Sequence, residues 1–436
     1  MGQPRLDDMP PEVLGQICAP LVEEERKLSL LSLSRVSKRL RAFVLPDIFR
    51  ELTPVFVSDK EELSQSSLPS LLRTMITNPT IASMVQDIDF THHGNPIFSQ
   101  EDVEIFVKAA NLLGIPVPES VLQRPGRPST RTEPWNIIRY EGEDGEILQF
   151  LMEMIAAHTP NLESLQYHVS DEGSVLQVLM SASNSKRDSP LLPRLRNVRI
   201  DHLATAREIR PLADFAPNLT SLRIDNTRGG VAGVRFENVT ELVLMFVRFT
   251  GQELKDLLQG FPSLKDFFFN FNFCNGDPDA DLCTPQQAVD ALEPFKKQLT
   301  DVRLSFWDWQ IFHHSTTGFP PGLITSMTML EALEHLVLDG RSLWRKVSSE
   351  EENYNAEAAQ LFVKMLPRSL KTLALIRLDS ETYGDDLMVL APQIKSCCPE
   401  LQSIYYQLHN GSEMNKRRLT RITKLFAEQG VAFEKW

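Results

Sequence analysis

The chain has 436 residues, of which 42% are hydrophobic, and it carries a formal net charge of −13. This content is sufficient for a folded protein, whereas the negative charge argues against a general electrostatic attraction to nucleic acid or to an anionic membrane. The five cysteines are too few and too irregularly spaced for a disulfide framework. The sequence shows no secretory signal and no apolar run of about 20 residues, so we expect a soluble intracellular protein, cytoplasmic or nuclear.

Residues 1–52 predict a small helical domain. Pro10 and Pro11 suit the first turn of a helix, where a missing N–H group costs nothing. Leu14 and Ile17 then continue an apolar stripe at helical spacing. A domain of this size cannot bury all of its apolar residues alone, so we expect them to lie partly against another protein.

A charged break at residues 23–27 separates this first helix from a leucine-rich stretch. That stretch predicts one or two further short helices, and Pro46 is expected to end the pattern. The alternative interpretation is an ordinary helical cap that buries all of these apolar residues against the rest of the chain.

The order and spacing of the residues resemble an F-box of the fungal type. The run Met9-Pro10-Pro11-Glu12-Val13-Leu14 is similar to the family's Leu-Pro-x-Glu-Leu-Leu opening. Ile17 matches its first-helix Ile, residues 33–36 match its Leu-x-x-Val block, and residues 46–50 resemble its Pro-x-Leu-Tyr-Arg ending. The sequence departs from the family at Cys18, where Phe is usual, and at Leu40, where Trp is frequent.

The resemblance implies that this domain binds a Skp-type adaptor protein and, through the adaptor, a cullin. The positions expected to face or support the adaptor are Pro10, Pro11, Leu14, Ile17, Leu33, Val36 and Leu40.

Residues 53–80 are expected to form a helical connection with a helix over Leu68–Ile76. Val85, Ile88 and Phe90 have the spacing of an early repeat. Residues 114–134 are rich in Pro, Arg, Ser and Thr, which predicts an insertion loop. Such a loop is either disordered or a partner-binding segment.

After residue 150, short blocks of the form apolar-x-x-apolar-x-apolar recur. Each block predicts a buried strand, and a proline before several of them ends the preceding helix. The blocks are Leu162/Leu165/Tyr167, Leu195/Val198/Ile200, Leu219/Leu222/Ile224, Val239/Leu242/Leu244, Leu264/Phe267/Phe269, Leu299/Val302/Leu304, Leu333/Leu336/Leu338, Leu370/Leu373/Leu375 and Leu401/Ile404/Tyr406. Helices are expected between blocks, over Gln252–Gln259, Pro285–Phe295, Ala356–Met365 and Leu387–Cys397.

The number of blocks makes residues 81–409 resemble a leucine-rich-repeat array. A strand-plus-helix unit has an apolar face that only its neighbours can cover, so the units should stack into a right-handed α/β solenoid. The resemblance implies a curved fold with a parallel sheet on its concave face.

Strand alternation identifies the side chains expected on that concave face. Arg199, Arg223 and Arg303 are candidates for binding carboxylates or a phosphorylated segment, because a guanidinium group binds two oxygens at once. The alternative is that Arg199 pairs with Asp201, and Arg223 with Asp225, across neighbouring strands. A second candidate substrate patch consists of Val243, Met245 and Phe268.

Residues 410–436 are expected to form an amphipathic helical cap over the last repeat. The aromatic group Phe306, Trp307, Trp309 and Phe312 offers either binding anchors or packing for a long connection. No nucleotide-binding, metalloprotease or hydrolase motif is found, and the Asp277–Asp281 segment lacks the glycine and glutamate of a calcium loop. We therefore expect no catalytic residue, metal or cofactor.

These resemblances imply a substrate-recognition subunit of a Skp–cullin–F-box ubiquitin ligase, which itself needs no catalytic residue. The F-box would bind the adaptor and the repeats would bind an unknown protein substrate, with no role for nucleic acid or membrane. The alternative is a non-degradative leucine-rich-repeat interaction scaffold.

Overall fold

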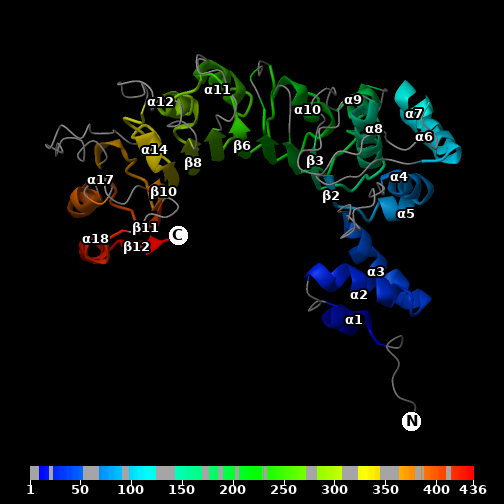
Figure 1. The fold of residues 1–436 in the computed structure, drawn as a ribbon, viewed down its shortest axis with the longest axis horizontal. Helices are drawn as coiled ribbons and strands as arrows, with labels where there is room; N and C mark the ends of the chain where they lie inside the picture. The colour runs from blue at the N-terminus through cyan, green and yellow to red at the C-terminus, as the bar shows by residue number, and fades with distance from the viewer. Residues whose placement is uncertain are drawn as a thin grey trace, which may run out of the picture. The chain divides into compact units, whose positions relative to one another are not determined.

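The computed structural model describes residues 9–18, 23–52, 68–90, 98–123, 143–168, 176–184, 190–201, 206–227, 229, 233–271, 282–306, 323–343, 363–378, 384, 387–408 and 414–436. The chain divides into two compact units, residues 1–200 with 214–218, and residues 201–213 with 219–436. Figure 1 shows the helices and strands of both units.

The first unit begins with three helices, α1 (Pro11–Cys18), α2 (Glu23–Ser34) and α3 (Lys38–Arg50). A small core holds them together and consists of Cys18, Leu30 and Val44, with Leu33, Phe43 and Ile48 packed against it. Ser37 caps α3 by accepting a hydrogen bond from the backbone N–H of Leu40 at 3.1 Å. The helical character expected of this segment is therefore present.

Two sequence-based expectations about these helices were wrong. The charged residues 23–27 do not separate two helices, because α2 begins at Glu23 and contains them. Pro46 does not end the pattern, because it lies inside α3. Proline has no N–H group, so the carbonyl of Ala42, four residues earlier, lacks its usual helical donor. Because Pro46 and Ala42 are both exposed, water can donate a hydrogen bond to this carbonyl instead.

The rest of the first unit alternates helices with short strands. The strands are β1 (Glu51–Leu52), β2 (Asp87–Phe90), β3 (Ser164–His168) and β4 (Asn197–Asp201). The helices are α4 (Leu68–Thr77), α5 (Pro79–Ala82), α6 (Gln100–Leu113), α7 (Glu119–Gln123), α8 (Glu143–Ala157) and α9 (Gln177–Asn184). Strands β1, β2 and β3 pair in parallel, and β4 is the next strand in the order.

The helix expected over Leu68–Ile76 is confirmed as α4, and the early repeat supplies β2. Within the expected insertion loop, residues 119–123 form α7, whereas residues 124–134 lie outside the described residues.

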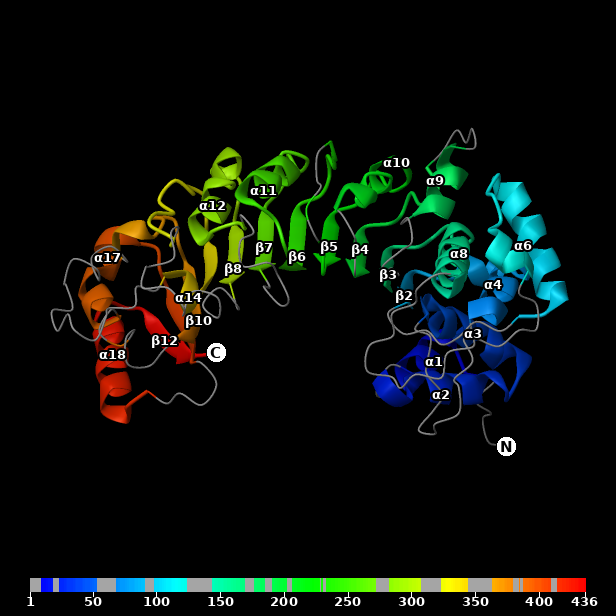
Figure 2. The same cartoon turned by 45° about the horizontal axis from the view of Figure 1, so that its top comes forward.

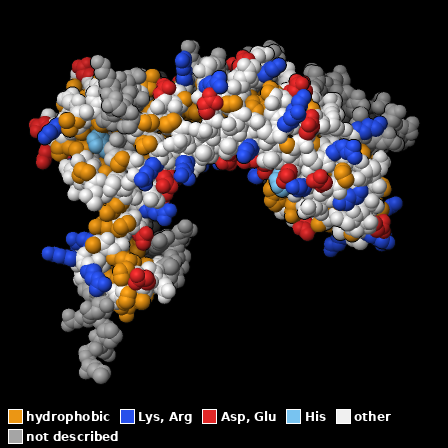
Figure 3. Space-filling model, turned by 180° about the vertical axis from the view of Figure 1, so that it is seen from behind, with side chains coloured by type: hydrophobic (Ala, Val, Ile, Leu, Met, Phe, Trp, Pro, Cys, Tyr) orange, Lys and Arg blue, Asp and Glu red, His pale blue; other side chains and the backbone are white. Residues whose placement is uncertain are grey.

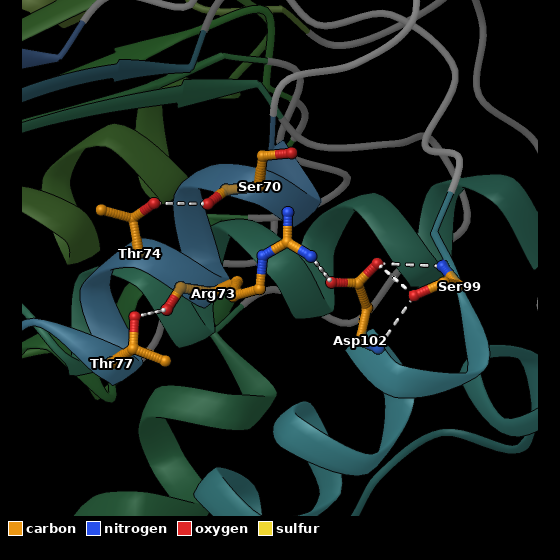
Figure 4. Close-up of polar contacts among 6 residues, drawn as sticks. All are labelled: Ser70, Arg73, Thr74, Thr77, Ser99 and Asp102. Carbon is orange, nitrogen blue, oxygen red and sulfur yellow. Dashed lines mark hydrogen bonds and ion pairs between the residues drawn. The ribbon is translucent and has the colours of Figure 1, made fainter.

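Asp102 connects α4 with α6 (Figure 4). Its Oδ2 accepts hydrogen bonds from the backbone N–H and the hydroxyl of Ser99, each at 2.9 Å, which completes a capping box at the start of α6. Its Oδ1 lies 3.0 Å from Nη1 of Arg73 on α4. On the same helix, the hydroxyls of Thr74 and Thr77 donate to carbonyl groups one turn earlier. One carboxylate therefore caps one helix and pairs with the next.

The second unit repeats a strand and a connection. Its strands are β5 (Ser221–Asp225), β6 (Glu241–Val247), β7 (Asp266–Phe271), β8 (Asp301–Phe306), β9 (His335–Asp339), β10 (Thr372–Leu378), β11 (Ser403–Leu408) and β12 (Ala432–Lys435). Its helices and 3₁₀ helices are η2 (Ala206–Ile209), α10 (Leu212–Phe215), α11 (Gly251–Leu258), α12 (Pro285–Asp290), η3 (Glu293–Phe295), α14 (Gly340–Leu343), η4 (Ala391–Gln393), α17 (Ile394–Cys397) and α18 (Lys416–Glu428). α10 contributes residues to both units.

Every strand from β5 to β12 pairs in parallel with the next strand of the chain. Antiparallel neighbours are excluded by this arrangement, so each connection must cross back over the sheet, as α11 and α12 do on one side of β6–β8 (Figure 2). This α/β arrangement with a parallel sheet is consistent with the leucine-rich-repeat-like array expected from the sequence.

The repeated blocks explain the core of the second unit. In each block the two strand residues that point toward the helices are buried, for example Leu242 and Leu244 on β6 or Val302 and Leu304 on β8, all 0% exposed. A backbone ladder joins the strand entries, since Lys265 N–H donates to the Thr240 carbonyl at 2.8 Å and Thr300 N–H donates to the Lys265 carbonyl at 2.8 Å. The apolar pattern thus fixes both the core and the register.

The C-terminal segment ends in a strand as well as the expected helix. α18 buries Ile422 and Phe426, and Gly430 then adopts a left-handed conformation with φ of 70°. This turn directs the chain into β12, where the ring of Phe433 stacks on Tyr406 with a centroid separation of 4.8 Å. Sequence patterning indicated the amphipathic cap but not the final strand.

Candidate binding surfaces

Exposed large hydrophobic side chains are concentrated on the first two helices and the turn that follows them. On α1, Val13 and Ile17 are one turn apart and are 38% and 42% exposed. On α2, Leu28 and Leu31 are likewise one turn apart and are 68% and 40% exposed, while Val36 is 65% exposed. Figure 3 shows hydrophobic side chains on these helices. We call these five residues the N-terminal apolar surface.

The residues predicted to bind an adaptor divide into exposed and buried positions. Pro10, Pro11, Ile17 and Val36 are exposed, Leu33 is half-buried, and Leu14 and Leu40 are 3% and 1% exposed. The two buried leucines support the helices from inside and do not face a partner.

Sequence reasoning missed Val13, Leu28 and Leu31 as surface residues. The spacing of apolar residues shows which of them share a helix face, but it does not show which of two apolar faces packs against the core. On α2 the sequence does contain two apolar faces, because Leu28 and Leu31 share one face and the buried Leu30 lies on another.

The second candidate surface is the face of β5–β9 opposite their helix-facing residues, which we call the open face. Parallel pairing aligns its side chains in rows across the strands. The first row contains Ser221, Glu241, Asp266, Asp301 and His335. The second row contains Arg223, Val243, Phe268, Arg303 and Val337.

The arginines of the open face are already paired within their own strands. Nε of Arg223 donates to both carboxylate oxygens of Asp225, at 2.9 and 3.0 Å. Arg303 contacts Asp301 through Nε at 3.0 Å and through Nη2 at 3.2 Å, and this hydrogen bonding raises the pKa of Arg303. The pairing expected for Arg223 is thus confirmed, although within one strand. Arg199 is half-buried on β4, in the first unit.

A groove of about 280 Å³ lies on the open face of β6–β9. Its apolar side is formed by Val243 and Phe268, which are half-buried, and its polar side includes Glu241 and Asp266. Met245 is half-buried further along β6 and does not line the groove. The structure therefore brings together three predicted substrate residues, Val243, Phe268 and Arg303.

Burial raises the pKa of Asp266 above its usual value, and the hydroxyl of Thr300 partly offsets this by donating a hydrogen bond. The carboxylates of Asp301 and Glu241 raise this pKa further, while Lys265 lowers it. The groove is thus a site of accumulated negative charge.

Strand alternation places the next row along the strands on the open face as well, but this row is mostly buried. Asp225, Asn270, Ser305 and Asp339 are 2%, 7%, 2% and 0% exposed. Part of the reason is Arg377, which lies within an irregularity of β10 between Leu375 and Leu378 and has a left-handed φ of 54°. Its Nη1 donates to Asp339 at 2.6 Å and to Ser305 at 3.0 Å. These residues are structural in this conformation.

Neither a metal-ligand group nor a membrane-spanning helix is found in the part of the chain that the structure describes. Among the described residues, no group of three or more His, Cys, Asp or Glu side chains is placed to hold a metal ion. No helix in the described part is long and apolar enough to cross a bilayer. Phe306 is buried in the second unit, whereas Trp307, Trp309 and Phe312 lie outside the described residues.

Comparisons with solved structures find distant structural likenesses. No protein-family model matches the sequence, and no curated protein matches it. The crystal structure of the leucine-rich-repeat-containing protein LegL7 from Legionella pneumophila matches with a TM-score of 0.33 and 14% sequence identity. The match covers 64% of this chain and 76% of that one.

Proposed function

We propose that this chain is the substrate-recognition subunit of a Skp–cullin–F-box ubiquitin ligase. The observation that carries the proposal is the N-terminal apolar surface, which lies on the segment whose sequence resembles an F-box. Exposed apolar residues on neighbouring turns of short helices are typical of a protein-binding face, because their burial supplies most of the binding free energy.

In this proposal the N-terminal helices bind the Skp-type adaptor and the open face of the repeats binds a protein substrate. The chain needs no reactive group, because it works by tethering. Holding the substrate beside a charged ubiquitin-conjugating enzyme raises the effective concentration of its lysines and orients them for transfer. Two separate surfaces on one chain are what such a receptor requires.

Co-purification of the full chain with a recombinant Skp-type adaptor tests the proposal. The test variant is Leu28→Asp with Leu31→Asp, because both side chains are exposed and their replacement leaves the small core intact. The matched control is Leu112→Asp with Leu122→Asp, which changes two leucines that are 79% and 45% exposed on α6 and α7.

We expect the wild type and the control to bind the adaptor, and the test variant to bind at least about tenfold more weakly, since each buried leucine contributes about 2 kcal/mol. Circular dichroism verifies that both variants fold. Failure of the wild-type chain to bind the adaptor, or equal binding by the two variants, refutes the proposal. Adaptor binding that recruits no cullin favours the non-degradative scaffold instead.

A further inference from the structure

We propose that the groove on the open face of β6–β9 binds an extended protein segment in which a Lys or Arg side chain is followed, two residues later, by an apolar one. This inference rests on the proposed function, because it names the class of substrate that the repeats would recognise. The expectation from sequence was the opposite, namely that arginines on this face would bind an acidic or phosphorylated segment.

The arginine pairings remove the basis for an acidic ligand. Both oxygens of Asp225 accept from Arg223, and both oxygens of Asp301 accept from Arg303. Each guanidinium charge is therefore balanced by a carboxylate of its own strand. An acidic segment would therefore meet a carboxylate beside each guanidinium, so neither arginine offers it an unopposed positive charge.

The carboxylates of the first row are not balanced in the same way. Glu241, Asp266 and Asp301 are direct partners in the parallel register of β6, β7 and β8. Adjacent strands lie about 4.8 Å apart, so three like charges stand side by side along the groove. Arg303 balances Asp301, whereas within the described residues Glu241 forms no ion pair. The groove thus has an excess of negative charge that a ligand cation would relieve.

The groove carboxylates call for hydrogen-bond donors. The carboxylate of Glu241 is exposed at the groove and can only accept hydrogen bonds. Lys and Arg side chains carry only donors.

The apolar part of the groove sets the spacing of the ligand. Val243 and Phe268 are partners in the register and stand one row beyond Glu241 and Asp266. Two residues along a strand span about 6.6 Å, which is also the separation of side chains i and i+2 in an extended peptide. A segment lying along the strands can therefore place a cation on the carboxylates and an apolar side chain on Val243 and Phe268.

An array of immobilised peptides Gly-Ser-X-Ser-Z-Ser-Gly tests the inference, with X as Arg, Lys, Glu or Ser and Z as Leu, Phe or Ser. The full-length chain is applied at low ionic strength. The groove variant is Glu241→Lys with Asp266→Lys. The control variant is Glu293→Lys with Glu400→Lys, which changes the net charge equally at exposed positions that do not line the groove.

We expect the wild type and the control to bind peptides with a basic X and an apolar Z about tenfold more strongly than the other peptides. The groove variant should lose this preference and favour Glu at X. Equal binding of basic and Ser peptides by the wild type overturns the inference. So does a groove variant that behaves like the control, or a preference that ignores Z.

Adaptor binding is measured on the same proteins. Loss of the peptide preference with the adaptor complex retained is expected of the groove variant. A wild-type chain that selects the basic apolar peptides but binds no adaptor contradicts only the ligase proposal. One that binds the adaptor but selects no peptide contradicts only the present inference.

Discussion

Glu153 on α8 is a buried carboxyl group that holds the start of α9 in place. It is 3% exposed, and its Oε1 accepts hydrogen bonds from Gln149 Nε2 and from the Leu176 N–H, both at 2.8 Å. Its Oε2 accepts from the N–H groups of Val178 at 2.7 Å and Leu179 at 3.2 Å. One side chain thus satisfies three backbone donors at a helix N-terminus.

Burial raises the pKa of Glu153 to about 7, although the hydrogen bonds from Gln149 and the backbone of α9 favour the charged form and oppose this rise. A pKa raised in the folded state means that protonation stabilises the fold. The stabilisation is fully present below the unfolded pKa near 4.5 and is lost as the pH rises through about 7. Between pH 5 and pH 8 the wild type should therefore lose about 2–3 kcal/mol through this group.

The Glu153→Gln variant removes the titration and retains the shape of the side chain. Its amide NH₂ group faces backbone donors, so it should be less stable than the wild type at pH 5, where the wild type is protonated. Because the variant does not titrate, this deficit should shrink by about 2–3 kcal/mol at pH 8. Other groups titrate equally in both proteins and cancel in the comparison.

Urea unfolding of the two proteins at pH 5 and pH 8, followed by circular dichroism, measures both differences. Glu153→Ala serves as the second variant, because it leaves the α9 donors buried and unpaired. It should cost about 3–5 kcal/mol at pH 5, and its deficit should shrink at pH 8 by the same amount as that of Glu153→Gln. A stability difference between wild type and Glu153→Gln that is the same at both pH values would refute the raised pKa. A loss below about 1 kcal/mol in Glu153→Ala at pH 5 would refute the capping role.

Two further predictions concern stability in the second unit. Arg377→Ala should destabilise the protein by about 3–5 kcal/mol in urea unfolding, because it leaves the fully buried Asp339 carboxylate without its cation. Arg303→Ala removes a more exposed ion pair and should cost about 1 kcal/mol or less. Equal losses in the two variants would contradict this prediction. Gly260→Ala should cost about 1–3 kcal/mol in a thermal melt, because a Cβ atom there would meet the carbonyl oxygen of Val234. Gly15→Ala on α1 is the control, because a Cβ atom added there has no other atom within 4 Å. This control variant should gain up to about 1 kcal/mol of stability, since Ala favours an α-helix more than Gly does. An unchanged stability of Gly260→Ala would show that Val234 can move.

The strands were predictable because their signal is local and repeated. Leu242 and Leu244, or Leu336 and Leu338, are buried for the reason that the apolar spacing indicates. Helix ends were less predictable, as Pro46 shows, because its tolerance inside α3 depends on the exposure of the carbonyl it leaves unpaired. The Glu153 cap left no sequence signal, since its backbone donors lie more than 20 residues further along the chain.

Alternation along a strand identifies the face of a residue but not what covers that face. Alternation places Ser305 and Asp339 on the side away from the helices, yet both are buried, because Arg377 on β10 hydrogen bonds to both. The left-handed conformation of Arg377 makes this contact possible, and it is not encoded in the apolar pattern.

The candidate site shows the same limit for charge. Arg223 and Arg303 each have an aspartate two residues away, and strand alternation places such a pair on one face, where the charges meet. Glu241 and Asp266 lie on separate strands, 25 residues apart in the sequence, and only the parallel register makes them neighbours. Ion pairs within one strand can therefore be predicted from the sequence. The charges left for a ligand are those that adjacent strands bring together with the same sign, and on this face they are negative.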